Sequence, residues 1–300
     1  MYSVATVVVT YNRRELLMEN IQSLLHQQPE VPDILIIDNH SSDGTGAAVQ
    51  AMMATEKKIH YYDTGANLGG AGGFSYGIRK AVDEGYDYLW IMDDDCIPTP
   101  NALDELLKAD QKLRGCYGFL SSKVLWTDGS LCRMNIQRHP LTKNIKFFDG
   151  ELLPATLASF VSLFVKRSAV EQVGLPIKEF FIWTDDWEYT RRISRMEKCY
   201  VVPQSVVVHK CKSNIGANIS NDAPERLDRY RYLYRNDVYL YRREGFVGFA
   251  YEVVRLYTHI FRVLTKSSGQ RCKRLSMILA GTLEGLRFHP QIEYVKDRPK

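Results

Sequence analysis

The stretch Leu89-Trp90-Ile91-Met92-Asp93-Asp94-Asp95 consists of four apolar residues followed directly by three carboxylates. The apolar run predicts a strand inside a sheet, whose carboxyl end delivers the acids to the edge where open α/β sheets bind ligands. Three adjacent carboxylates repel one another, and a bound divalent cation relieves that repulsion. The stretch therefore predicts a site for Mn²⁺ or Mg²⁺, and a solvated acidic turn is the alternative interpretation.

Strand-like and helix-like segments alternate on the amino-terminal side of this stretch. Buried strands are expected at Val4–Val9, Ile34–Ile37 and Ile59–Tyr62. Apolar residues at helical spacing, beginning at Leu17, predict a helix that starts near Arg14 and ends before Pro29. This alternation is typical of βαβ units, and it predicts an α/β fold with a mostly parallel central sheet.

Four glycines occur within five residues shortly after Asn67, in the string Gly69-Gly70-Ala71-Gly72-Gly73. Such a backbone can approach a ligand closely, and the amino terminus of the helix expected after it favours anions, so a diphosphate fits there. The alternative is a flexible turn before a close-packed helix.

A second acidic cluster lies in Trp183-Thr184-Asp185-Asp186-Trp187-Glu188, before an arginine-rich helix. Aromatic neighbours offer a flat surface to a sugar or base, and their low-dielectric wall raises the proton affinity of a carboxylate. That is the setting of a general base. Alternatively, these acids complement the dipole at a helix start.

Two further segments are expected to be core strands, namely Thr156–Val165 and the valine-rich run that ends at His209. A single histidine at a strand end is more often structural than a ligand. The predicted sheet nevertheless places this end near the acidic groups, and imidazole is a common ligand of borderline metals such as Mn²⁺.

Composition and charge restrict the class of protein. The six cysteines form no Cys-x-x-Cys pair, which predicts reduced thiols in a cytoplasmic protein and no zinc or redox motif. The amino terminus carries no basic region or cleavage site that would predict a signal peptide. No apolar run approaches the roughly 18 residues that a membrane span needs.

The carboxyl-terminal part differs in texture from the rest. Residues 221–300 contain 16 Lys and Arg against 9 Asp and Glu, whereas the whole chain has a net charge of only +4. Apolar residues at helical spacing predict amphipathic helices that pack on the domain and on each other. The alternative is peripheral contact of these helices with the anionic inner face of the cell membrane. No nucleic-acid motif accompanies the arginines, so a nucleic-acid partner is not expected.

In combination these motifs are more specific than any one of them. Val7-Val8-Val9-Thr10-Tyr11-Asn12-Arg13, the segment Ile36–Thr45, the acidic strand end, Asp185-Asp186 and His209 occur in an order that resembles the family 2 inverting glycosyltransferases of GT-A fold. The resemblance covers roughly residues 4 to 215. The string from Asn67 to Phe74, the triple Asp and the second acidic cluster look most like bacterial galactofuranosyltransferases. The resemblance implies a GT-A domain over 1–215 and a helical, basic extension over 216–300.

The resemblance also implies roles for individual residues. Asp186 matches the catalytic base, Asp93 and Asp95 match the metal-binding DXD motif, and His209 matches a third metal ligand. The triple Asp leaves open whether Asp93 or Asp94 contacts the ion with Asp95. The residues implied in substrate binding are Thr10, Asn12, Arg13 and Asp38 for the nucleotide, Asn67, Gly69 and Gly70 for the sugar diphosphate, and Asp94, Trp183, Asp185 and Trp187.

The implied activity is metal-dependent transfer of a sugar from a nucleotide-sugar to a hydroxyl of a glycan or lipid-linked glycan, as in polysaccharide or O-antigen synthesis. The expected donor is UDP-galactofuranose, with dTDP-rhamnose second. A binding module that keeps the fold without turnover is the alternative from another class. A dinucleotide-dependent oxidoreductase is disfavoured, because it needs glycines in the first turn, where this chain has Tyr11-Asn12-Arg13-Arg14.

Overall fold

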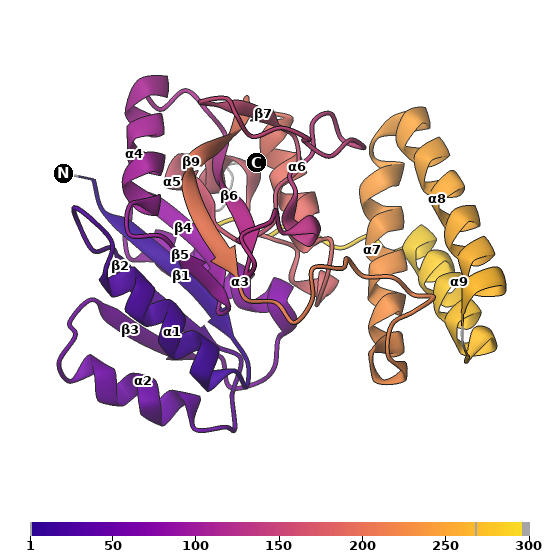
Figure 1. Ribbon diagram of the computed structural model, residues 1–300, viewed down its shortest axis with the longest axis horizontal. Coiled ribbons are helices and arrows are strands. Elements are labelled where there is room, and N and C mark those ends of the chain that lie inside the picture. The colour runs from indigo at the N-terminus through magenta and orange to yellow at the C-terminus, as the bar shows by residue number, and fades with distance from the viewer. Residues whose placement is uncertain (1, 268, 296–300) are drawn as a thin grey trace.

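The computed structural model of the chain describes residues 2–267 and 269–295. A mixed sheet forms its centre, with strand order β3-β2-β1-β4-β8-β6-β9-β5 and with β7 paired to β9 beside this path (Figure 1). The strands are β1 (Val4–Thr10), β2 (Asp33–Asp38), β3 (Ile59–Asp63), β4 (Tyr88–Asp93), β5 (Cys96–Pro98), β6 (Phe119–Trp126), β7 (Leu153–Ala155), β8 (Leu163–Lys166) and β9 (Cys199–His209).

Helices cover both faces of this sheet, and three more helices lie beside it. The α-helices are α1 (Arg14–Leu25), α2 (Thr45–Met53), α3 (Gly69–Asp83), α4 (Ala102–Leu113), α5 (Arg167–Val173), α6 (Asp185–Ser194), α7 (Tyr230–Arg242), α8 (Gly245–Lys266) and α9 (Arg271–Arg287). Short 3₁₀ helices are η1 (Arg133–Asn135), η2 (Lys178–Phe180) and η3 (Pro224–Arg229).

The first half of the sheet is parallel, as its βαβ pattern predicts. Strand β1 lies between β2 and β4, and its register pairs Thr10 with Asp38 and Val9 with Asp93. Because the strands run in the same direction, their carboxyl ends meet at one edge. The side chains that follow these strands are therefore brought together by the sheet itself.

The second half of the sheet is mixed. Strand β8 runs antiparallel to both β4 and β6, whereas β6 and β9 are parallel. The short strand β5 pairs antiparallel with β9, and this pairing sets Cys96 opposite His209. His209 consequently lies next to the turn that carries the three carboxylates.

The predicted strand over Thr156–Val165 is wrong in its extent. Only Leu163–Lys166 forms β8, and residues 156–162 are mostly irregular. Ser162 has a left-handed backbone with φ of 65°, which ends the extended run, and its hydroxyl accepts a 2.8 Å hydrogen bond from the Trp90 indole. Apolar composition identified this segment as buried without determining its backbone conformation.

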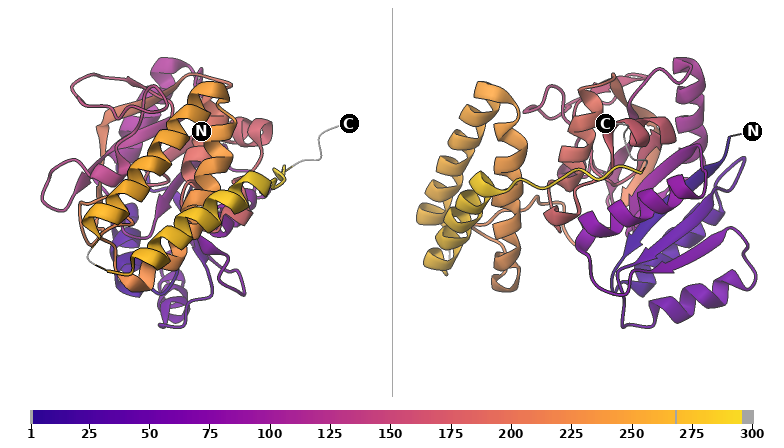
Figure 2. Two further views of the ribbon diagram at one scale, coloured as in Figure 1. Left: turned by 90° about the vertical axis from the view of Figure 1, so that its right-hand side faces the viewer. Right: turned by 180° about the vertical axis from the view of Figure 1, so that it is seen from behind.

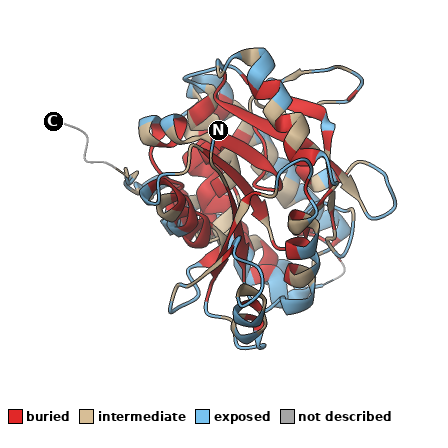
Figure 3. Ribbon diagram, turned by 90° about the vertical axis from the view of Figure 1, so that its left-hand side faces the viewer, coloured by how far each residue is buried: buried red, intermediate tan, exposed pale blue. Residues whose placement is uncertain are grey.

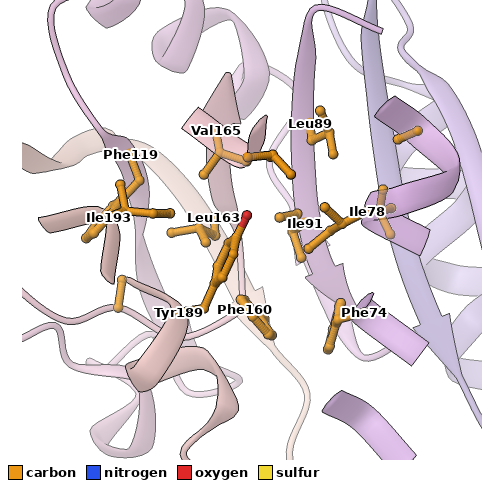
Figure 4. Packing of buried hydrophobic residues seen from close by; sticks show 14 of the residues in the cluster. Phe74, Ile78, Leu89, Ile91, Phe119, Phe160, Leu163, Val165, Tyr189 and Ile193 are labelled. Carbon is orange, nitrogen blue, oxygen red and sulfur yellow. The ribbon is translucent and has the colours of Figure 1, made fainter. Parts of the chain in front are cut away.

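Apolar side chains fill the space on both faces of the sheet, where the buried strands lie in the interior (Figure 3). On one face, Phe74 and Ile78 of α3 approach Ile91 of β4, and Tyr189 of α6 lies between Phe160 and Leu163 (Figure 4). Each fully buried side chain of this size contributes on the order of 1.5–3 kcal/mol. The core thereby fixes α3 and α6, the two helices whose amino termini face the acidic edge.

Helices α7, α8 and α9 form a bundle beside the α/β domain, as Figure 2 shows. The chain then returns to the domain, where the Leu175 amide donates a 2.8 Å hydrogen bond to the Glu293 carbonyl and Arg79 pairs with the Glu293 carboxylate at 3.1 Å. The predicted amphipathic helices are thus present. Among the described residues, none of the helices combines the length and the apolar character needed to cross a bilayer.

Candidate functional site

The end of β4 carries the acidic group around which the candidate site is built. Two residues at the end of β1 reach across to it. The hydroxyl of Thr10, the last residue of β1, donates a 2.7 Å hydrogen bond to Asp94 Oδ2, and Arg13 in the loop after β1 contacts Asp94 Oδ1 at 3.2 Å. Both oxygens of Asp94 are therefore engaged within the protein. Arg13 also pairs with Asp95 Oδ2 at 2.7 Å, which leaves Asp95 Oδ1 facing away from it.

Asp93, Asp95 and His209 bring one ligand atom each to within 4.8 Å of one another. Nε2 of His209 lies 3.0 Å from Asp95 Oδ1, a buried oxygen with no hydrogen bond of good geometry. Two carboxylates and an imidazole form a donor set that suits Mn²⁺, and the incompletely satisfied oxygen is a further sign of fit. These residues fit a divalent cation, and Asp94 is not one of the clustered three.

Burial and the charges of neighbouring groups determine the electrostatics of these acids. Burial, with repulsion from Asp95, raises the pKa of Asp93 to about 6. Burial also raises the pKa of Asp94 to about 7 despite the charge of Arg13. For Asp95 burial acts in the same direction, but the close contact with His209 and the charges of His209 and Arg13 outweigh it and lower the pKa. A cation would relieve the repulsion between these carboxylates.

Asn135 orients His209 and was not identified from the sequence. Its side-chain oxygen lies 2.7 Å from Nδ1 of His209, and its amide group donates a 2.9 Å hydrogen bond to Ser159. A partner of this kind fixes which ring nitrogen carries the proton and is typical of histidines that bind metals. No sequence signal could have found Asn135, because it lies 74 positions from His209 in a short 3₁₀ helix within a segment that has no periodic pattern.

The loops after β1 and β2 are joined to each other. Asp38 is buried and accepts a 2.8 Å hydrogen bond from the Ser41 amide and another of 2.8 Å from the Tyr61 hydroxyl. Asn12, whose φ is 51°, accepts a 2.7 Å hydrogen bond from the Ser42 amide. The two loops that the resemblance assigns to the nucleotide are thus hydrogen-bonded to each other.

The glycine string adopts a different structure from the predicted loop. Helix α3 begins at Gly69 itself, and the Asn67 side chain accepts a 2.9 Å hydrogen bond from the Gly69 amide. Gly69 has φ of 71°, and a Cβ there would lie 2.2 Å from the Phe181 carbonyl oxygen. At Gly73 a Cβ would meet the sheet, whereas at Gly70 nothing lies within 4 Å. Close packing explains Gly69 and Gly73, and only Gly70 leaves room for a ligand.

The second acidic pair lies at the amino terminus of α6. Burial, and then the charge of Asp93 among other groups, raises the pKa of Asp185 to about 7. Burial and the neighbouring Asp185 raise the pKa of Asp186 well above its usual value, with a further contribution from Asp93 and against a 2.7 Å hydrogen bond from the Trp187 amide. The two acidic groups are therefore close enough to act on one another. They form one site.

The loop before this pair has a strained backbone, and a residue of the helical bundle stabilises it. Phe181, Trp183 and Thr184 have positive φ angles of 62°, 67° and 66°. The Asn236 side chain on α7 donates to the carbonyls of Phe180, Ile182 and Trp183 at 3.0, 3.1 and 2.9 Å. Left-handed backbone in such residues persists only where the surroundings hold it. Helix α7 provides part of that support.

The two tryptophans predicted to bind substrate are both in contact with other side chains. The Trp183 ring packs against Tyr230 of α7 with centroids 5.0 Å apart, and Arg138 lies 3.9 Å from the centroid of Trp187. Glu188, from the same motif, pairs with Arg192 at 2.9 Å. Substrate contact by the tryptophans stays a prediction, and their visible role is to anchor the acidic segment.

Comparison with known proteins identifies the family of the chain and its relatives. The family model described as Glycosyl transferase family 2 matches residues 5–173. Galactofuranosyltransferase GlfT1 of Mycolicibacterium smegmatis is 25% identical over 256 residues, which cover 81% of this chain and 84% of that protein. GlfT1 of Mycobacterium tuberculosis is 26% identical over 256 residues, covering 81% and 83%.

Two solved structures resemble the chain at low sequence identity. GalNAc-T7 with UDP, GalNAc and Mn²⁺ matches with a TM-score of 0.60 and 16% identity, over 80% of this chain and 50% of that one. Staphylococcus aureus TarS 1-349 in complex with UDP matches with a TM-score of 0.55 and 11% identity, over 95% and 72%. At these identities the likeness concerns the fold, which is the GT-A fold expected from the sequence.

Proposed function

The chain belongs to glycosyl transferase family 2, and on this premise we propose that it transfers galactofuranose from a UDP-sugar to a hydroxyl of a glycan or lipid-linked glycan. The observation that carries the proposal is the convergence of the two acidic groups, one at the end of β4 and one at the start of α6. Sugar transfer with inversion needs charge stabilisation for the leaving diphosphate and a base for the incoming hydroxyl.

The two groups divide these tasks. Asp93, Asp95 and His209 would hold Mn²⁺ or Mg²⁺, which when bound offsets the charge of the diphosphate. Asp186 takes the proton of the acceptor hydroxyl as its oxygen attacks the anomeric carbon and the nucleoside diphosphate departs. Its raised pKa makes this carboxylate a stronger base than an exposed aspartate. Asp185 binds sugar hydroxyls beside it.

The choice of sugar rests on the GlfT1 relatives, which are about 25% identical to this chain. The more weakly covered relatives act on other sugars, for example the undecaprenyl-phosphate mannosyltransferase of Micrococcus luteus, 34% identical over 106 residues that cover 35% of this chain and 43% of that protein. A rhamnosyltransferase that uses dTDP-rhamnose is the alternative within the enzyme class.

A donor screen tests the proposal. The protein is incubated with UDP-galactofuranose, UDP-galactose or dTDP-rhamnose, with Mn²⁺ and a simple or lipid-linked glycoside, and release of nucleoside diphosphate is measured. We expect release with UDP-galactofuranose that depends on the acceptor and is absent with Asp186→Asn. Release only with dTDP-rhamnose would replace the donor. Binding of UDP without release from any donor would favour a non-catalytic binding module.

We further propose that the bundle contacts the inner face of the cell membrane, where a lipid-linked acceptor is found. Basic side chains are exposed on helices α8 and α9 of the bundle, among them Arg262, Lys266, Arg271 and Lys273. Exposed apolar area flanked by cations is the composition of surfaces that bind anionic bilayers. The exposed apolar residues of α8 and α9 are Phe246, Val247, Phe249, Val254, Tyr257, Phe261, Leu264, Leu279, Leu283 and Leu286.

A further inference from the structure

Two cysteines lie on the Nδ1 side of the His209 ring. The Cys132 sulfur is 3.7 Å from Nδ1 and 3.9 Å from the Cys211 sulfur. All three ligand atoms lie within 4.8 Å of one another. Cys132 is buried, whereas Cys211 is partly exposed. This group is distinct in chemistry from the carboxylates on the other side of the ring, because thiols select soft or borderline metals.

The backbone holds the two cysteines at this spacing. The Cys132 amide donates a 3.0 Å hydrogen bond to the Val124 carbonyl, which folds the loop after β6 back onto that strand. The Asn214 side chain accepts from the Arg133 amide at 2.7 Å and donates to the Leu131 carbonyl at 3.0 Å. The segment that follows His209 is thus tied to the loop that carries Cys132. The sulfurs are placed by the fold and not by a flexible tail.

Two of the three ligand spacings match a tetrahedral zinc site, which forms once Asn135 Oδ1, 2.7 Å from Nδ1 and 3.0 Å from the Cys132 sulfur, turns aside. Zn–S bonds of about 2.3 Å and Zn–N bonds of about 2.0 Å at tetrahedral angles require sulfurs about 3.8 Å apart and sulfur and nitrogen about 3.5 Å apart. The distances here are 3.9 and 3.7 Å. We propose that Cys132, Cys211 and Nδ1 of His209 bind Zn²⁺, with release of the two thiol protons and a fourth position left to solvent.

This site shares His209 with the carboxylates and therefore competes with them. A neutral imidazole has one nitrogen with a free lone pair, so it can bind a metal through Nε2 or through Nδ1 but not both. When Nε2 binds, the Nδ1 proton is donated to Asn135 Oδ1, 2.7 Å away. When Nδ1 binds Zn²⁺, the Nε2 proton is donated to Asp95 Oδ1, 3.0 Å away. An acceptor is in place for either tautomer.

Consequently, binding of a thiophilic metal weakens binding of the hard metal that the proposed reaction uses. When Zn²⁺ is bound at the two thiolates and Nδ1, Nε2 carries the proton and can only donate a hydrogen bond. The cation site at Asp93 and Asp95 then has one ligand fewer. The competition rests on the proposed function of those three residues, whereas binding at the thiols does not. The experiment therefore measures the two separately.

Metal-free protein is titrated with Cd²⁺, and thiolate-to-cadmium charge-transfer absorption in the ultraviolet is recorded. Cys211→Ser removes one ligand with little change of volume, and Cys272→Ser, at an exposed cysteine on α9, is the matched control. We expect saturation near one equivalent in the wild type and in Cys272→Ser. In Cys211→Ser we expect most of the absorption to be lost and the Zn²⁺ affinity, measured against a chromophoric chelator, to fall by at least about tenfold.

The competition is measured by electron paramagnetic resonance of bound Mn²⁺. Cd²⁺ should displace Mn²⁺ from the wild type and not from Cys211→Ser. Equal cadmium absorption in both proteins would overturn the thiol site, and undiminished Mn²⁺ binding at full cadmium absorption would overturn the shared histidine. If Cys211→Ser does not fold, judged by circular dichroism, Cys211→Ala takes its place. Failure to release UDP from any donor would count against the proposed function alone, because the cadmium titration needs no turnover.

Discussion

The hydroxyl of Thr184 donates a 2.7 Å hydrogen bond to Asp237, and this bond joins the residue before the second acidic pair to helix α7. Asp237 is itself buried and pairs with Arg255 of α8. Thr184 and Asp237 thereby connect the bundle to the segment that carries the candidate base, Asp186. A segment that the sequence marks only as basic and helical helps to shape the site.

We expect Asn236→Ala to reduce turnover, because it removes three hydrogen bonds that hold the left-handed backbone before Asp185. A misplaced base affects the chemical step more than donor binding, so kcat should fall by about 10- to 100-fold while the KM for the donor changes little. Steady-state kinetics of UDP release measure both.

Asn221→Ala, at an exposed position before the bundle, serves as the control for Asn236→Ala and should leave the kinetics unchanged. Thermal unfolding of both variants separates positioning from stability. A loss of kcat only in proportion to the unfolded fraction would mean that Asn236 has no role in positioning.

Replacing the candidate base should separate binding from chemistry. Asp186→Asn keeps the size of the side chain and an oxygen for the Trp187 amide, but it cannot accept the hydroxyl proton. We expect turnover to fall at least about a hundredfold, the usual scale for a lost general base, with UDP binding nearly intact. Near-normal turnover in this variant would exclude Asp186 as the base.

The acidic triplet should divide by role. Asp95→Asn removes a charged oxygen from the group that fits a cation, whereas Asp94 is engaged with Thr10 and Arg13. We expect Asp95→Asn to weaken Mn²⁺ binding by at least about tenfold and Asp94→Asn to weaken it less. Paramagnetic resonance of free Mn²⁺ gives the affinities, and the opposite order would assign the ion to Asp94. Chelation by EDTA should stop UDP release, and Mn²⁺ or Mg²⁺ should restore it.

The pH dependence should reflect the buried acidic pair. A general base acts as its carboxylate, and burial raises the pKa of Asp186 and raises that of Asp185 to about 7. Protonation should therefore remove activity as the pH falls through neutrality, whereas an exposed aspartate with a pKa near 4 would lose none until about pH 5. The profile of kcat/KM at constant free Mn²⁺ provides the test, and a flat profile down to pH 5 would contradict it.

Membrane contact should depend on the exposed apolar face of α8. Tyr257 and Phe261 lie one helical turn apart and are 71% and 64% exposed. The double change Tyr257→Glu and Phe261→Glu should abolish sedimentation with vesicles that contain anionic lipid. Phe147→Glu, at a 74% exposed position in a loop of the α/β domain, is the matched control and should sediment normally. Equal sedimentation of both variants would remove this surface from consideration.

The sequence by itself determined the first half of the sheet and the edge at which chemistry can occur. Runs such as Val4–Thr10 and Tyr88–Asp93 are apolar on both faces and end in polar residues, so they predict parallel strands whose ends meet. The acids at Asp93–Asp95 were recognisable because they follow an apolar run, and those at Asp185-Asp186 because aromatic residues flank them. The α/β class followed from these patterns, whereas the GT-A fold was implied by the resemblance of the motifs and their order to family 2 glycosyltransferases.

Only the tertiary structure decided which partners surround those acids. Asp94 differs from Asp93 because Thr10 and Arg13, more than 80 positions away, occupy its oxygens. His209 is oriented by Asn135 of the short helix η1, and the backbone before Asp185 is held by α7. Such contacts depend on hydrogen bonds between segments with no periodic pattern. Local sequence fixes where a strand ends, but the role of a side chain at that end depends on which distant groups the fold brings to it.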